Sequence, residues 1–245
     1  FDEQAGRWRL VTESSETIWC DVVISAVGQL SRPHTPNIAG EDTFEGPRFH
    51  SARWDHSVSL RGKEVAVIGT GASAIQFVPW IAHEAQRVTL YQRTAPWILP
   101  KWDSRYGRLH QQLIKVLPLW PRLERFAVWL IFEVLAVTLV DAKPLSRILG
   151  AVARYHLHRQ VADPMLRRQL TPSDAPGCKR VLFSNDYYPA IANGEVSLVT
   201  NAVAKLCDKG VVTDDGVLHH ADVVIYGTGF RATDFLAPMR VRGWE

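Results

Sequence analysis

One short stretch of the sequence decides the fold, the run EVAVIGTGASA at residues 64–74. Its first part, residues 64–68, is apolar and rich in β-branched side chains, which is typical of a strand buried on both faces of a sheet. The second part has the pattern Gly-x-Gly-x-x-Ala. Gly69 permits a tight turn, Gly71 leaves room for a pyrophosphate near the backbone, and Ala74 lets a helix and a strand pack closely. The stretch therefore predicts the strand, turn and helix start of a dinucleotide-binding unit.

The residues that follow complete a β-α-β unit. Residues 73–85 have helical spacing, with Pro79 inside the helix, and residues 87–92 indicate a second strand. Two such strands within about 30 residues are expected to be parallel, with a right-handed crossover. The N–H groups at the helix start then face the phosphates. The predicted cofactor-binding residues are Gly69, Thr70, Gly71, Ser73 and Ala74. The alternative is a glycine turn that binds no ligand.

The end of the second strand indicates which dinucleotide binds. An NAD site usually has an acidic residue there, which holds the ribose 2′-hydroxyl. This chain has Gln92, Arg93 and Thr94 instead. A carboxylate would repel a 2′-phosphate, whereas the guanidinium of Arg93 can bind it with two hydrogen bonds. The sequence therefore predicts NADPH rather than NADH, with Arg93 and Thr94 as further cofactor-binding residues; the alternative is that Arg93 is a solvated surface arginine.

Composition narrows the class of protein. The chain has 245 residues, is 47% hydrophobic and carries a net charge of +3, with no basic block, so nothing indicates a nucleic-acid partner. Cys20, Cys178 and Cys207 are too widely spaced for a disulfide framework or a zinc site, so we expect no metal and a cytoplasmic location. The sequence starts at Phe1 without a signal peptide, and we expect it to be an internal piece of a longer chain.

The rest of the chain suggests a second domain. Residues 21–27 and 221–227 both contain Asp-Val-Val-Ile followed by small residues, and both predict a buried parallel strand. Between them, residues 101–176 have helical spacing and predict an inserted helical subdomain. Its apolar run, residues 126–140, is shorter than the roughly 20 residues of a membrane span. We expect this helix to be buried, with weak association with a membrane surface as the alternative.

A second motif precedes the glycine pattern. Residues 44–55, FEGPRFHSARWD, match F-x-G-x-x-x-H-x-x-x-W-[P/D] at every fixed position. The fixed positions are Phe44, Gly46, His50, Trp54 and Asp55. This resembles the fingerprint of the Baeyer–Villiger monooxygenases, in the flavin-containing monooxygenase superfamily. Other short segments are similar in sequence to the branch of this family that oxidises 4-hydroxyacetophenone. They are residues 27–28, 73–76, 92–94, 177–180, 186–189 and 227–230.

The resemblance implies an α/β, Rossmann-like flavoprotein with two dinucleotide-binding domains, which bind FAD and NADP, and a helical insertion. From this resemblance we expect residues 1–60 to form part of the FAD-binding domain and a linker. Residues 61–102 and 177–220 would form the NADP-binding domain, residues 103–176 the insertion, and residues 221–245 the return to the FAD-binding domain. The family's first FAD motif, Gly-x-Gly-x-x-Gly, is not in this sequence, so the chain alone is expected to be inactive.

The resemblance also implies roles for residues outside the glycine pattern. His50 would lie on the linker and couple domain motion to turnover without acting as an acid or base, while Phe44 and Trp54 anchor the linker by packing. The alternative for His50 is a hydrogen-bonded loop histidine. Lys179 would contact the NADP 2′-phosphate together with Arg93, and Arg180 would lie beside the flavin and stabilise the peroxyflavin and the tetrahedral adduct. The residues similar to a C-terminal FAD motif are Asp222, Thr228 and Gly229. For Asp222, capping of a strand is an equal alternative.

The implied reaction consumes NADPH and O₂. Reduced FAD captures O₂ as a C4a-peroxide, which attacks a ketone and gives an ester or a lactone. Two alternatives stay open: a related flavin monooxygenase that oxidises nitrogen or sulfur, and an inactive NADPH-binding remnant of a truncated gene. The sequence does not define which ketone is the substrate.

Overall fold

The computed structural model describes residues 1–103, 105–140 and 143–234. The chain divides into two compact units. The smaller unit contains residues 1–34 and the chain from Phe230, and the larger unit contains residues 35–229. All candidate cofactor-binding residues lie in the larger unit.

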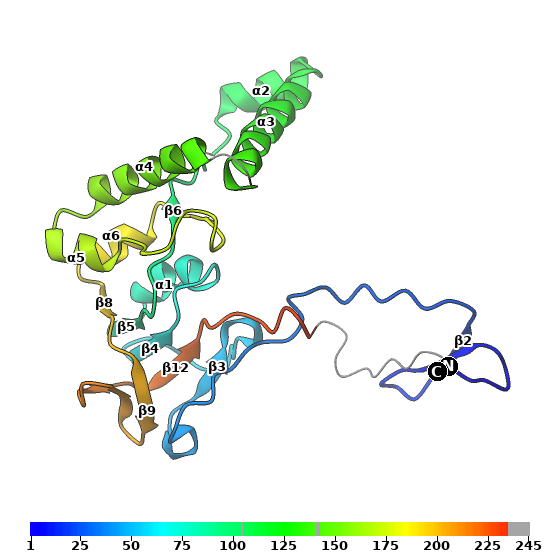
Figure 1. The fold of residues 1–245 in the computed structure, drawn as a ribbon, viewed down its shortest axis with the longest axis horizontal. Helices are drawn as coiled ribbons and strands as arrows, with labels where there is room; N and C mark the ends of the chain where they lie inside the picture. The colour runs from blue at the N-terminus through cyan, green and yellow to red at the C-terminus, as the bar shows by residue number, and fades with distance from the viewer. Residues whose placement is uncertain (104, 141–142, 235–245) are drawn as a thin grey trace. The chain divides into compact units, whose positions relative to one another are not determined.

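A five-stranded sheet organises the larger unit (Figure 1). Its order is β3-β12-β4-β5-β8, and every neighbouring pair is parallel. The strands are β3 (Arg48–His50), β12 (Val223–Tyr226), β4 (Glu64–Ile68), β5 (Arg87–Tyr91) and β8 (Val196–Val199). From β4 the chain moves through β5 to β8 on one side and later adds β12 on the other. The strand order therefore reverses beside β4, as in doubly wound α/β proteins, and the predicted α/β, Rossmann-like fold class is confirmed.

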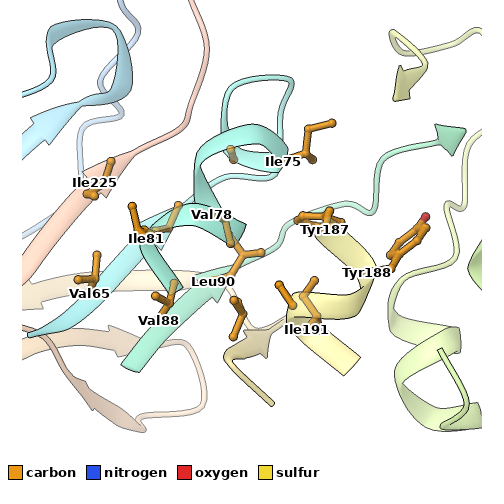
Figure 2. Packing of buried hydrophobic residues seen from close by; sticks show 14 of the residues in the cluster. Val65, Ile75, Val78, Ile81, Val88, Leu90, Tyr187, Tyr188, Ile191 and Ile225 are labelled. Atoms are coloured by element: carbon orange, nitrogen blue, oxygen red, sulfur yellow. The ribbon is translucent and has the colours of Figure 1, made fainter. Parts of the chain in front are cut away.

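Helices cover one face of this sheet. Helix α1 (Ala74–Ala82) connects β4 to β5 and ends earlier than the sequence predicted. Its buried face includes Ile75, Val78 and Ile81, which pack with Val65 and Leu90 of the sheet. Helix α6 (Tyr187–Ala192) completes the layer, and its buried tyrosines lie at the edge of the same cluster (Figure 2). The spacing that predicted an amphipathic helix thus corresponds to its contact with the sheet.

A second, antiparallel sheet packs against the other face. It has the order β11-β10-β9, from β9 (Val203–Cys207), β10 (Gly210–Thr213) and β11 (Leu218–His220). Strands β10 and β11 form an antiparallel hairpin. Leu206 and Val211 pack there with Ala66 of β4 and Val224 of β12. Alternate residues of β4 thus face the two cores, which explains why the whole strand is apolar.

The insertion is helical, as predicted. It contains α2 (Arg108–Val116), α3 (Trp120–Val140), α4 (Lys143–Gln160) and α5 (Pro164–Gln169). Two short strands, β6 (Ile98–Leu99) and β7 (Leu182–Phe183), pair in parallel at its ends. Trp97, Leu99 and Val181 pack there against Leu149 and Ala153 of α4.

The expected burial of the apolar run at residues 126–140 was wrong for the described side chains. Large apolar residues of α3 from Phe126 to Val134 are 43–57% exposed, because the helix packs on its neighbours along only part of its surface. No described helix is long and apolar enough to cross a membrane.

The smaller unit contains an antiparallel hairpin of β1 (Trp8–Val11) and β2 (Thr17–Cys20). The strand predicted at residues 21–27 is not formed. Val22 is 72% exposed and Ile24 is 86% exposed, and no described strand lies beside this segment to satisfy its backbone. The similar run at residues 221–227 does form a buried strand, β12, because β3 and β4 flank it.

Strand β12 lies within residues 221–245, which the sequence assigned to the return to the FAD-binding domain. The strand lies inside the same sheet as the glycine pattern, and only the chain from Phe230 is grouped with residues 1–34. The domain limits proposed from the sequence stay a prediction.

Candidate functional site

The carboxyl ends of the parallel strands meet at one edge of the sheet. In the ladder, Tyr226 of β12 lies between His50 of β3 and Ile68 of β4, and Tyr91 of β5 lies on the other side of Ile68. Open α/β sheets bind ligands at this edge, where the strand order reverses. Here that point falls between β4 and β12, directly before Gly69.

The glycine turn, residues 69–74, is packed against the end of β12. Gly69 has a φ of 108°, and a Cβ on it would lie 2.6 Å from the carbonyl oxygen of Gly227. A Cβ on Gly227 would in turn lie 3.2 Å from the Cβ of Ala74. Glycine at 69 is therefore required by the fold itself. The packing role of Gly227 was not predicted, although this residue ends the apolar run at 221–227.

Gly71 has a different environment. The nearest heavy atom to a Cβ placed there is the carbonyl oxygen of Gly227, at 3.7 Å, which is an ordinary contact distance. Gly71 is also exposed. No close protein neighbour excludes a side chain from this position, which agrees with the expectation that Gly71 leaves space for a ligand. Ser73, the residue before α1, and Ala74, its first residue, follow at the helix start.

A chain of hydrogen bonds connects the glycine turn to two distant segments. The Thr70 hydroxyl donates to the carbonyl oxygen of Thr94 at 3.1 Å. The Lys179 ammonium donates to the Thr94 hydroxyl at 3.0 Å and forms an ion pair with Asp174. The indole N–H of Trp97 donates to the carbonyl oxygen of Asp174 at 2.9 Å. The structure therefore brings together the predicted residues Thr70, Thr94 and Lys179, and it adds Asp174 and Trp97, which sequence reasoning missed.

Two exposed arginines flank this hydrogen-bonded chain. Arg93 precedes Thr94, and Arg180 follows Lys179. Neither forms an ion pair with another residue in the described part of the chain. Gln92 is buried instead and donates to the carbonyl oxygen of Gln169 at 2.8 Å. The site can thus offer three cationic side chains to an anionic ligand.

The motif at residues 44–55 has a structural basis in packing. Phe44 is 3% exposed and lies in the core beneath β12. Trp54 contacts Phe49 at 5.2 Å and Phe77 of α1 at 5.4 Å between ring centroids, both edge to face. A Cβ on Gly46 would lie 2.3 Å from the carbonyl oxygen of Asp222, which leaves no space for a larger residue. The expected packing of Phe44 and Trp54 is therefore observed.

His50 and Asp55 form local hydrogen bonds within the motif. His50 is 5% exposed, and its Nδ1 accepts from the backbone N–H of Ala52 at 3.1 Å, which caps the short helix η2 (Ser51–Arg53). The carboxylate of Asp55 accepts from the hydroxyl of Ser57 at 2.6 Å and from its N–H at 3.0 Å. Both hydrogen bonds lower the pKa of Asp55, and the bond from the Ser57 hydroxyl has the larger effect.

The candidate FAD residues do not lie together. Asp222 precedes β12 at the amino edge of the sheet, and its carboxylate accepts from the N–H of Glu64 at 2.8 Å. This is the strand-capping alternative for Asp222. Thr228 and Gly229 lie at the carboxyl edge, directly after Gly227, and Gly229 has a φ of 84°.

Comparisons with known proteins agree with this geometry. The family model described as flavin-binding monooxygenase-like matches residues 2–238. An uncharacterized monooxygenase of Mycobacterium tuberculosis is 45% identical over 99% of this chain and 48% of its own length. A Baeyer-Villiger monooxygenase of Pseudomonas aeruginosa is 39% identical over 96% of this chain and 44% of its own length.

The solved structures include an oxidized steroid monooxygenase bound to NADP. It superimposes with a TM-score of 0.79 at 28% identity, over 96% of this chain and 52% of that one. The chain thus spans about half the length of the relatives it matches. The resemblance predicted from residues 44–55 is confirmed.

Proposed function

The chain belongs to the flavin-binding monooxygenase-like family, and we propose that it is part of an NADPH- and FAD-dependent Baeyer–Villiger monooxygenase. Such an enzyme inserts one oxygen atom from O₂ next to a ketone carbonyl and gives an ester or a lactone. The observation that supports this most directly is the glycine turn after β4, which packs against the end of β12 and is connected through Thr94 to Lys179. We also propose a cytoplasmic location, which fits the three free cysteines.

The residues at the carboxyl edge fit NADPH. Gly69 and Gly227 hold the glycine turn close to β12, while Gly71 is open to a pyrophosphate, and the first turn of α1 directs N–H groups toward negative charge. Lys179 and Arg93 would bind the 2′-phosphate, Arg93 with two hydrogen bonds. Residues 92–94 contain no carboxylate that would favour the 2′-hydroxyl of NAD.

The fit to FAD is weaker in this part of the protein. Residues 21–27 pair with no described strand, and Asp222 caps the opposite edge of the sheet. We therefore propose FAD as a cofactor on the basis of the family. Thr228 and Gly229, at the carboxyl edge of the sheet, are the residues that we propose to contact it.

The chemistry divides between cofactors and side chains. When bound, NADPH supplies reducing equivalents and FAD supplies the activation of O₂. Arg180 would donate hydrogen bonds to the ketone oxygen, where negative charge develops during the reaction. A permanently charged donor at such a position typically contributes about 10²–10³ in rate. Lys179 and Thr94 would hold the nucleotide, and His50 would act only through the position of its linker.

The test uses the full-length protein with NADPH, ¹⁸O₂, an aryl ketone and an aryl sulfide, with products identified by mass spectrometry. We expect an ester that carries one ¹⁸O atom. Arg180→Ala should lower the rate of ester formation by about 10²–10³, while the dissociation constant for NADPH changes little. A sulfoxide without ester from several ketones would favour a monooxygenase for nitrogen or sulfur. Binding of NADPH without any oxygenated product would favour the inactive remnant.

Weak association with a membrane surface is a second candidate role, and the exposed apolar side chains of α3 favour it. Phe126 is 57% exposed and Trp129 is 53% exposed, with Arg122 and Arg125 one turn away on the same helix. Apolar side chains beside basic ones are typical of helices that bind anionic lipid surfaces. We expect the protein to sediment with vesicles that contain phosphatidylserine more than with neutral vesicles. Sedimentation that Phe126→Ser with Trp129→Ser leaves unchanged would refute this role.

A further inference from the structure

A carboxylate lies where the proposed 2′-phosphate site is expected to be purely basic. The Lys179 Nζ is 2.5 Å from the Asp174 Oδ2 and 3.0 Å from the Thr94 Oγ1. An ammonium group has three N–H donors. Two of them point to these oxygens, so one donor is left for a ligand.

The backbone of Asp174 is held in position by a buried tryptophan, Trp97. Its carbonyl oxygen accepts from the indole N–H of Trp97 at 2.9 Å. Trp97 is 6% exposed and packs with Leu149 and Ala153 of α4, and the guanidinium of Arg154 lies 5.9 Å from its ring centroid. The backbone of Asp174 is therefore fixed to a core, and its carboxylate stays within reach of Lys179.

The ammonium is fixed from the other side by the glycine turn. The Thr94 hydroxyl accepts from Lys179, and the Thr94 carbonyl oxygen accepts from the hydroxyl of Thr70 at 3.1 Å. A phosphate on the remaining donor of Lys179 would come within about 6 Å of the Asp174 carboxylate, since each hydrogen bond spans about 3 Å. The dianion and the carboxylate would then repel each other.

Solvent limits the size of this repulsion. The side chain of Lys179 is 48% exposed and that of Asp174 is 40% exposed, so water and salt screen the charges. For a phosphate of charge near −2 at about 6 Å, the screened repulsion corresponds to a change of about three- to tenfold in a dissociation constant.

We propose that Asp174 is a specificity-determining residue of the nucleotide site. It keeps the Lys179 ammonium at Thr94 and, by its charge, lowers the affinity for a 2′-phosphorylated adenine nucleotide, so that the nucleotide stays exchangeable. Arg93, which has no acidic partner among the described residues, then contributes the larger net attraction. This role rests on the proposed function, because it requires NADPH as the dinucleotide.

The test is calorimetric binding of NADP⁺, NAD⁺ and adenosine 2′,5′-bisphosphate to the full-length protein. Asp174→Asn removes the charge but keeps an oxygen that accepts from Lys179. We expect it to bind NADP⁺ and the bisphosphate about three- to tenfold more tightly, with unchanged affinity for NAD⁺ and a steeper loss of affinity with salt. Asp174→Glu keeps the charge and should resemble the wild type.

Asp103→Asn is the matched control. Asp103 forms an equally short but more exposed ion pair with Lys101, 2.5 Å from oxygen to nitrogen, outside the hydrogen-bonded chain at Thr94. Asp103→Asn makes the same change in net charge and should leave the dissociation constants of all three nucleotides unaltered. An Asp174→Asn protein that prefers NADP⁺ over NAD⁺ like the wild type, or binds NADP⁺ more weakly, overturns this role alone. A wild-type protein that binds NADP⁺ no better than NAD⁺ overturns the proposed cofactor as well.

Discussion

Replacement of Gly69 by alanine should damage the fold, whereas the same change at Gly71 should damage only nucleotide binding. At Gly69 an added Cβ would lie 2.6 Å from the Gly227 carbonyl oxygen, about 0.8 Å closer than the 3.4 Å at which ordinary contact begins. Relief of such a clash costs about 1–3 kcal/mol. The φ of 108° adds about 1–3 kcal/mol for a residue with a Cβ.

The expected loss for Gly69→Ala is therefore about 2–6 kcal/mol in the free energy of unfolding, the sum of the two ranges. Urea denaturation followed by circular dichroism measures it. Gly194→Ala separates the two causes, because Gly194 has a φ of 80° but no heavy atom within 4 Å of its Cβ position. That variant should lose only the backbone contribution, about 1–2 kcal/mol at this φ.

Gly71→Ala has its nearest contact at 3.7 Å and should unfold like the wild type, within about 0.5 kcal/mol. Its affinity for NADP⁺ should fall at least tenfold, on the order of 1.4 kcal/mol, because the methyl group occupies the space of the pyrophosphate. A Gly69→Ala protein as stable as the wild type would refute the packing of Gly227 against the turn. A Gly71→Ala protein that binds NADP⁺ normally would refute the position of the pyrophosphate.

Three further predictions test the packing and the local hydrogen bonds. Leu90→Ala, at a residue that is 0% exposed, should cost about 2–5 kcal/mol of unfolding free energy in urea, whereas Leu109→Ala, at 72% exposure, should cost less than about 0.5 kcal/mol. Tyr226→Phe should cost about 1 kcal/mol in the same assay, because it removes the 2.9 Å hydrogen bond to the Glu41 carboxylate; an equal or higher stability would contradict this. Ser57→Ala should raise the pKa of Asp55 toward its usual value, because the Ser57 hydroxyl donates to the charged carboxylate and stabilises it. NMR of the Asp55 carboxyl carbon measures this pKa. In the wild type this stabilisation is lost as the pH falls through the pKa of Asp55, when the carboxylate becomes protonated.

The local part of the site was predictable from the sequence. The glycine turn, the strand before it and the helix after it lie within residues 64–82, and each position has a reason that a single segment supplies. The turn between β10 and β11 contains Asp215 and Gly216, a pair of residue types that favours a hairpin. In these segments the pattern of apolar residues and the chemistry of the turn favour the same structure.

Contacts between distant segments were not predictable in this way. Gly227 meets Gly69 only because β12 inserts beside β4, and Lys179 reaches Thr94 from a segment 85 residues away in the sequence. The two runs with Asp-Val-Val-Ile show the same limit. Residues 223–226 form a buried strand between two neighbours, while residues 21–27 have no neighbouring strand in the part of the chain that the structure describes, and most of them are exposed. Partner strands, rather than the run itself, decide the outcome.

The pairing of β6 with β7 explains how a long insertion can lie between two halves of one site. The register joins Ile98 to Leu182 and Leu99 to Phe183, a constant offset of 84 residues. Extended backward along both parallel strands, this offset places Lys179 beside residue 95, next to Thr94, where its ammonium is found. The insertion therefore begins after one strand of this two-stranded pair and ends before the other, so its two ends lie side by side. Its helices can differ in length or sequence without separating Thr94 from Lys179, as long as these two short strands remain paired.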